Sequence, residues 1–341
     1  MTCKPTEVFR RAALVGGVAL LVTLFLRLGP TRVLSLLASL GYNFVVVVAL
    51  FAAHEFMRTL AITRWLPADT RPSVAELLRI RFLGEAAGAL TRTGSLAAEP
   101  ARAWLLANRS GRVVHGYSAA AGELMANSAT SAAVNVAVAG WMLLTGRLTG
   151  PLTVLAHVLF WGSLVYMTAV VSIVLSRVRI LGMYARLAAR LPLVGRRLRM
   201  DPLQMREMQR AITAALTDRK GVLARILLLE LSAQALLVSE VYWTMRSMGM
   251  ALSGPTALFI EVMTRPLTVI ELVGATETGF AVVFTWLGMP AAIGFTLSLI
   301  KTLRSLAAAG IGIGLLPHGN RARPQHVSTL QARGAVLDPG T

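Results

Sequence analysis

Cysteine is nearly absent from this 341-residue sequence, and so are the patterns that mark most metal and nucleophile sites. The single cysteine, Cys3, excludes an internal disulfide and a cysteine-based metal cluster. The five histidines are scattered, and after His54-Glu55 the place of a zinc protease's second histidine is taken by Arg58. No Gly-x-Ser-x-Gly nucleophile elbow occurs. We therefore expect no metal, no cofactor and no catalytic residue.

Lysine is also scarce, so arginine carries nearly all of the positive charge behind a formal net charge of +18. Hydrophobic residues make up 55% of the chain, above the roughly 45–50% of soluble domains. The arginines cluster between the hydrophobic runs, which is typical of cytoplasmic loops and also favours anionic lipid headgroups. The composition therefore predicts a polytopic membrane protein that binds no nucleic acid.

Six apolar runs are long enough to cross about 30 Å of hydrocarbon. The basic stretch Ser176–Lys220 is predicted to be a cytoplasmic loop of amphipathic helices, and Thr31–Leu40 a short amphipathic helix at the outer surface. No small-x-small cleavage site follows the first run, so we expect an uncleaved inner-membrane protein with both termini in the cytoplasm. The expected spans are residues 12–26, 42–66, 115–145, 151–175, 221–245 and 291–316.

Two further stretches, 74–108 and 254–288, are apolar but carry charges and are broken by glycine or proline. The predicted orientations of the full spans agree with one another only if each of these two stretches enters and leaves the membrane on the same side. The expected fold is therefore all-α, with about six full spans and two re-entrant helical hairpins. Its two halves, 42–145 and 221–316, would form a possible inverted repeat, which is the architecture of secondary transporters.

Several acidic and basic residues lie within the apolar segments, where a lipid-facing charge costs roughly 2.5–3.5 kcal/mol. Glu99 and Arg102 follow a glycine-containing break and share one helix face, so the break and the guanidinium could bind a phosphate. A similar break precedes Thr276 and Glu277. The predicted substrate-binding residues are Glu99, Arg102, Glu123, Thr276, Glu277, Lys301 and Arg304, with the glutamates as possible carriers of a coupling proton.

The charged residues that follow the two breaks have the same spacing, because 24 residues separate Glu99 from Glu123 and also Glu277 from Lys301. The alternative for embedded charges is structural ion pairing or an interfacial position. That alternative fits best the charges near the ends of the fifth span, namely Arg225, Glu230, Glu240 and Arg246.

The stretch Gly94–Leu106, with its Gly-x-x-x-x-Glu-Pro-x-Arg-x-x-x-Leu pattern, resembles the signature of a flippase-like membrane family. That family is related to the membrane domain of lysylphosphatidylglycerol synthases and includes a hopanoid-biosynthesis-associated branch. Glu123, the segment Gly274–Gly279, Lys301 and Arg304 fall where the family's other motifs lie. The resemblance implies a transmembrane domain over residues 1–316 that moves an anionic phospholipid or lipid-linked substrate across the membrane.

The residues after the last span, 317–341, are polar and are expected to be disordered. They are too few for the soluble aminoacyl-transferase domain of the synthases, so we expect no such enzyme activity. An intramembrane lipid-modifying enzyme and a non-transporting scaffold for lipid-synthesis enzymes remain alternatives. Small-residue motifs around Gly84–Gly88 also allow a homo-oligomer.

Overall fold

The computed structural model describes residues 19–68, 71–91, 94–110, 113–146, 148–175, 220–268 and 274–314. Within these ranges the chain forms helices and no strand. Four helices are long and apolar enough to cross a membrane. The helix at residues 19–28 and the helix that follows it meet at an angle of 89°, and together they make a fifth crossing if the bent pair counts as one span. The protein is therefore an all-α, multi-pass membrane protein. The four helices are α3 (Asn43–Thr63), α7 (Pro151–Leu175), α10 (Lys220–Ser247) and α13 (Ala291–Gly314).

The amphipathic helix predicted after the first apolar run is confirmed as α2 (Pro30–Leu40). It begins where Gly29 adopts a positive φ of 86° and Pro30 occupies the first helical turn, which explains the sharp bend. The third expected span corresponds to α6 (Val113–Leu144), a helix of 32 residues and thus about 48 Å long. Because α6 is not among the helices that are long and apolar enough to cross a membrane, the count of six spans stays a prediction. The basic stretch 176–219 and the tail lie outside the described residues.

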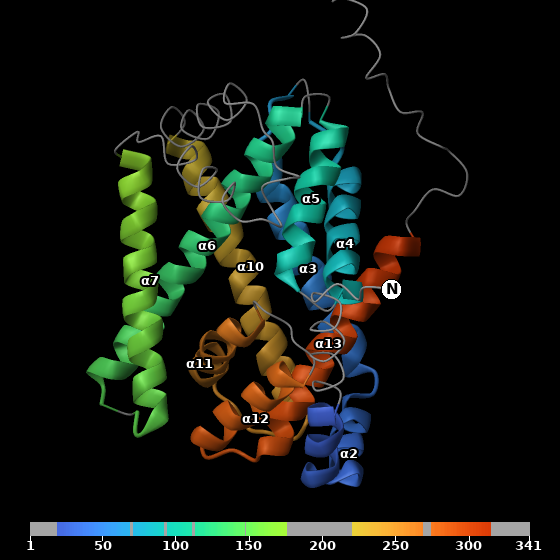
Figure 1. The fold of residues 1–341 in the computed structure, drawn as a ribbon, viewed down its shortest axis with the longest axis vertical. Coiled ribbons are helices and arrows are strands. Elements are labelled where there is room, and N and C mark those ends of the chain that lie inside the picture. The colour runs from blue at the N-terminus through green and yellow to red at the C-terminus, as the bar shows by residue number, and fades with distance from the viewer. Residues whose placement is uncertain are drawn as a thin grey trace, which may run out of the picture.

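Each half of the chain contains a broken helical pair. The first is α4 (Val74–Thr91) and α5 (Ser95–Arg109). The second is α11 (Gly254–Thr264), extended by the 3-10 turn η2 (Arg265–Thr268), and α12 (Ala275–Trp286). Both second helices begin after a glycine with positive φ, Gly94 at 53° and Gly274 at 80°, which most other residues adopt only with strain. Figure 1 places α4 and α5 in the upper half of the molecule and α11 and α12 in the lower half.

The packing of the two halves is reciprocal. The first helices of the halves, α3 and α10, lie side by side at the centre. The first hairpin helix of each half packs on the last helix of the other, which pairs α4 with α13 and α11 with α6. Helices α3 and α13 also touch, as do their counterparts α10 and α6. Each of these contacts between the halves therefore has a counterpart made by the corresponding helices.

The helix α7 stands at the outside of the molecule (Figure 1). Its Val154, Val158, Trp161 and Val165 are 57–66% exposed, at the three- and four-residue spacing of one helix face. A large apolar face without a protein partner is expected where a helix contacts lipid. The main apolar core lies in the lower half instead, where α10, α11, α12 and α13 bury residues such as Met245, Ile260, Phe284 and Leu297.

Gly312 is expected to be essential to the contact between α13 and α4. A Cβ atom there would lie 2.7 Å from the backbone carbonyl carbon and oxygen of Phe82, so Gly312→Ala must push the helices apart. Overpacking of this kind typically costs about 1–3 kcal/mol. Gly310→Ala is the matched control, because no atom lies within 4 Å and alanine favours a helix by about 1 kcal/mol. Thermal unfolding in detergent should show opposite shifts, and equal shifts would contradict the close contact.

Candidate functional site

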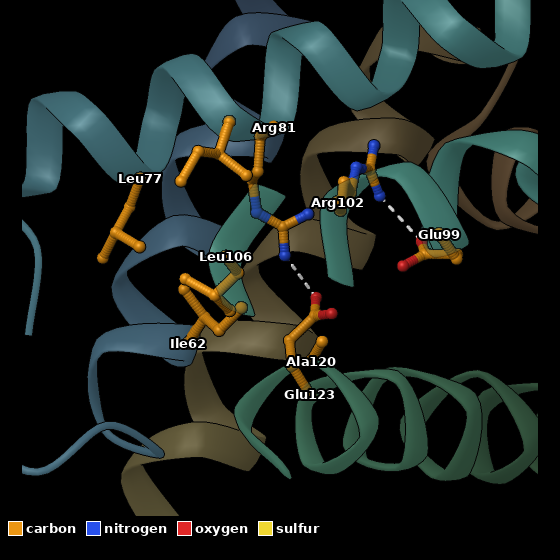
Figure 2. A pocket seen from close by; sticks show the side chains of 9 residues that line it. Ile62, Leu77, Arg81, Glu99, Arg102, Leu106, Ala120 and Glu123 are labelled. Carbon is orange, nitrogen blue, oxygen red and sulfur yellow. Dashed lines mark hydrogen bonds and ion pairs between the residues drawn. The ribbon is translucent and has the colours of Figure 1, made fainter. Parts of the chain in front are cut away.

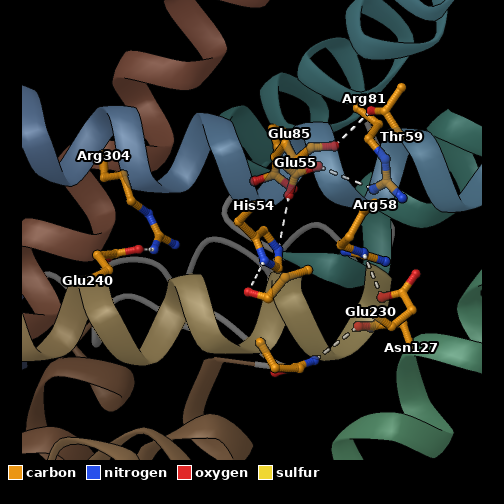
Figure 3. Close-up of polar contacts among 12 residues, drawn as sticks. His54, Glu55, Arg58, Thr59, Arg81, Glu85, Asn127, Glu230, Glu240 and Arg304 are labelled. Carbon is orange, nitrogen blue, oxygen red and sulfur yellow. Dashed lines mark hydrogen bonds and ion pairs between the residues drawn. The ribbon is translucent and has the colours of Figure 1, made fainter. Parts of the chain in front are cut away.

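A network of buried ion pairs joins five helices around three arginines, of which Arg81 and Arg102 are labelled in Figure 2 and Arg58 in Figure 3. Arg58 of α3 donates from Nε to Glu123 Oε1 of α6 at 2.8 Å, and its Nη2 lies 2.6 Å from the same oxygen. Arg81 of α4 also binds Glu123, and its Nη1 donates to Glu55 Oε2 of α3 at 3.2 Å. The one carboxylate of Glu123 thus holds two guanidinium groups in a part of the protein shielded from solvent.

Arg102 of α5 extends the network to the first hairpin. Its Nη1 donates to Glu99 Oε1 at 2.7 Å, its Nη2 binds Glu85 of α4, and Nη2 lies 3.6 Å from Glu55 Oε2. Glu99 and Arg102 share one helix face, as their three-residue spacing predicts, and they bind each other there. Gly84 makes room for this side chain, since a Cβ atom there would lie 2.2 Å from Arg102 Cγ.

Three of the predicted site residues, Glu99, Arg102 and Glu123, meet at one small cavity (Figure 2). Arg81 completes its polar side. The other wall is apolar, and the cavity has room for about one water molecule. The apolar wall consists of Ile62, Leu77, Ile80, Leu106 and Ala120.

Lys301 and Arg304 do not reach this cavity; they form separate ion pairs in the second half. Lys301 Nζ donates to Glu261 Oε2 of α11 at 2.7 Å and lies 5.7 Å from the centre of the Phe280 ring. Arg304 binds Glu240 of α10 and stacks on Phe51, with the guanidinium carbon 3.9 Å from the ring centre. Both cations are therefore already neutralised by a carboxylate and covered by an aromatic ring.

Thr276 and Glu277 have local roles at the start of α12. The Gly274 N–H donates to Glu277 Oε2 at 2.8 Å, so the glutamate closes the N-terminus of its own helix. Thr276 donates to the Leu267 carbonyl at 3.4 Å. The sequence analysis grouped these two residues with Glu99 and Arg102 as substrate-binding residues, but in the structure they do not line the cavity between α4, α5 and α6.

The ion pairs of the two halves join corresponding helices with reversed charge. In the first half, the last helix, α6, supplies the anion, while α3 and α4 supply the cations. In the second half, the last helix, α13, supplies the cations, while α10 and α11 supply the anions. The pairs are Arg58–Glu123 and Arg81–Glu123 in the first half, and Glu240–Arg304 and Glu261–Lys301 in the second.

Sequence reasoning did not place Glu55, Arg58, Arg81 and Glu85 in the site. Their spacing could have suggested it, because α3 and α4 each carry a glutamate and an arginine three or four residues apart, as α5 does. Arg225 and Arg246 are exposed, and their position at the membrane interface stays a prediction. An interfacial position is wrong for two other residues of α10, because the side chains of Glu230 and Glu240 are 0% and 1% exposed. For Glu240 the alternative of structural ion pairing is confirmed, since Arg304 binds it. The hairpin charges Arg92 and Glu271 lie outside the described residues.

Comparisons with known families, with curated proteins and with solved structures find no match to this chain. The flippase-like resemblance therefore rests on the short sequence motifs alone.

Proposed function

We propose that this protein is a flippase-like lipid transporter that moves an anionic phospholipid or lipid-linked substrate across the inner membrane. The observation that carries the proposal is the buried network around Arg58, Arg81 and Arg102. Burying charges costs several kcal/mol per ion, and apolar side chains of similar volume hold helices together at least as well. Within a membrane such a cluster is therefore expected to serve a substrate or ion pathway.

The relation between the halves supports a transporter. Reciprocal helix packing, and ion pairs that join corresponding helices, are what two related units of opposite orientation would produce. In transporters built this way, substrate sites lie near the bilayer midplane beside broken helices, and one unit rocks against the other. In our proposal α4–α5 and α11–α12 are the two re-entrant hairpins, entering from opposite sides of the membrane.

Arg102 is the residue proposed to bind the headgroup. A guanidinium binds phosphate oxygens through two parallel hydrogen bonds, which is a geometry that lysine lacks. In the present conformation Glu85 and Glu99 occupy these donors, and the neighbouring cavity is too small for a headgroup. The phosphate would therefore replace the carboxylates as α5 moves away from α6. This exchange keeps the arginine paired throughout, so it avoids the cost of an isolated buried charge.

Reconstitution into liposomes with a fluorescent phosphatidylglycerol tests this function. We expect the wild type to accelerate movement between leaflets, more for phosphatidylglycerol than for phosphatidylcholine. Losing a charge-assisted hydrogen bond, about 1.5–3 kcal/mol, should make Arg102→Ala slower by roughly 10- to 100-fold. Arg109→Ala is the control, because this arginine of the same helix is half exposed and pairs only with Glu76 at 3.2 Å among the described residues.

The outcomes separate the alternatives. If Arg102→Ala elutes as a folded protein and still moves lipid at the wild-type rate, the proposed site is wrong. If the wild type moves neither lipid, transport of these lipids is contradicted and the enzyme and scaffold alternatives gain. Mass spectrometry after incubation with a membrane lipid extract then distinguishes those two, since only an enzyme makes a new lipid.

A further inference from the structure

Glu230 of α10 is a buried carboxylate without a hydrogen bond. Its side chain is 0% exposed, and neither carboxylate oxygen has a donor within hydrogen-bonding distance. The nearest cationic atom is Arg58 Nε at 3.8 Å, and that N–H already donates to Glu123. Figure 3 shows Glu230 beside Arg58 at the edge of the network. Burying such a carboxylate in its charged form carries the full free-energy cost of desolvation, and no hydrogen bond offsets that cost.

The network also carries more acids than bases. Among the residues that the structure describes it contains three arginines and five glutamates, so these would hold a charge of +3 − 5 = −2 with every group ionised. The members are Arg58, Arg81, Arg102, Glu55, Glu85, Glu99, Glu123 and Glu230.

The surroundings of Glu230 offer no described cation that could balance this surplus. Two arginines, Arg58 of α3 and Arg81 of α4, act on its charge. Two glutamates, Glu55 of α3 and Glu123 of α6, act on it with the opposite sign. On α3, His54 uses Nδ1 to contact the Ala233 carbonyl and places Nε2 3.5 Å from Glu55. The cations of α11 and α13 are engaged with other carboxylates, since Arg265 and Lys301 pair with Glu261 and Arg304 pairs with Glu240.

We propose that Glu230 carries a proton in this conformation and that its protonation is coupled to binding of the anionic headgroup. A buried acid without donors becomes neutral by taking up a proton rather than remaining charged. The coupling to the headgroup rests on the proposed transport function, whereas the proton on Glu230 does not. The inference adds to that function a coupling ion, H⁺, and the residue that holds it.

Arg58 provides the physical link between Glu230 and Arg102. Its guanidinium lies 3.8 Å from Glu230 on one side and 3.8 Å from Glu99 on the other, and Glu99 binds Arg102. In this conformation Glu99 still binds Arg102. When a phosphate displaces Glu99 from Arg102, Arg58 can pair with Glu99 as long as a proton keeps Glu230 neutral. When Glu230 loses the proton to water, its carboxylate competes for Arg58, Glu99 returns to Arg102, and the phosphate leaves. Proton and headgroup thus favour each other's binding, and this coupling is reciprocal.

Polar side chains next to Glu230 offer a path for the proton. Gln234, one helical turn along α10, donates from Nε2 to Ser131 Oγ at 2.8 Å and to Asn127 Oδ1 at 3.2 Å. Asn127 and Ser131 continue the face of α6 that begins with Glu123, at intervals of four residues. A chain of hydroxyl and amide groups can hold water in a membrane interior and relay a proton along it.

Infrared spectroscopy of the protein in lipid nanodiscs tests the proton directly. We expect the carbonyl stretch of a protonated carboxylic acid in the wild type and its loss in Glu230→Gln, which keeps the shape of the neutral acid. Glu240→Gln is the matched control, because Glu240 is equally buried on the same helix but is bound by Arg304, so the band should remain. A band of unchanged intensity in Glu230→Gln overturns the inference.

Transport in the same liposomes separates this inference from the proposed function. With a pH dye enclosed, headgroup movement by the wild type should carry protons and slow as the pH rises, whereas Glu230→Gln should show neither effect. A Glu230-dependent band without any lipid movement contradicts the transport function and leaves the proton site standing. Lipid movement that ignores pH, with no such band, contradicts the coupling and leaves the transport function standing.

Discussion

Replacing Arg81 with alanine is expected to lower the free energy of unfolding by about 3–5 kcal/mol. Arg81 is the cation that binds Glu55 and Glu123 together, and its side chain is 3% exposed. Its removal leaves two buried carboxylates that face each other with one cation fewer between them. The cost arises from these uncompensated charges rather than from the small volume lost.

Thermal or denaturant unfolding in detergent micelles measures this effect. Arg109→Ala, which breaks a half-exposed pair with Glu76, should cost no more than about 1 kcal/mol. Adding Glu123→Gln to Arg81→Ala should recover part of the loss, because one of the stranded charges is then removed. An Arg81→Ala protein as stable as the Arg109→Ala protein would show that water or a counterion screens the network, and that it is not buried as described.

Reversing one charge in the second half is expected to be comparably severe and to be repaired by a second reversal. Glu261→Lys would place three cations together, because Lys301 and Arg265 both lie within 4 Å of Glu261. Leaving buried cations without an anion should cost about 3–5 kcal/mol. The double variant Glu261→Lys with Lys301→Glu restores an ion pair between the same helices, so most of the stability should return.

This exchange of the two charges is informative because it places the anion on the last helix of the second half. The first half already has its anion on its last helix, α6. Comparing the single variants with the double variant in one unfolding assay yields the coupling energy of the pair. Additive effects of the two single changes would contradict direct pairing of α11 with α13. A rescued protein that still moves lipid would place the Glu261–Lys301 pair outside the substrate path, in agreement with its separation from the cavity at Arg102.

Two carboxylates that resemble each other in sequence have different surroundings in the structure. Glu99 and Glu277 both follow a glycine break and both precede a charged residue by 24 positions. Glu99 turns into the network and binds Arg102, whereas Glu277 turns back to the Gly274 N–H. The coupling proton that the sequence assigned to Glu99, Glu123 or Glu277 is therefore better placed on Glu230, the network carboxylate without a donor.

The features that the sequence by itself determined are local ones. Apolar runs predict membrane helices because of their length, the breaks lie at Gly94 and Gly274 because glycine tolerates a positive φ, and Glu99 meets Arg102 because three residues bring side chains to one helix face. Each of these depends on residues within one continuous segment of the chain.

Only the tertiary structure decided which charges meet across helices. In a membrane the lipid-facing and the inward-facing sides of a helix are both apolar, so the pattern along the chain does not reveal the buried side. Arg81, Glu123 and Glu55 therefore meet through the mutual rotation and height of three helices, which the sequence pattern did not reveal. The same geometry kept Lys301 and Arg304 away from Arg102, and it left Glu230 buried beside an arginine that serves another carboxylate.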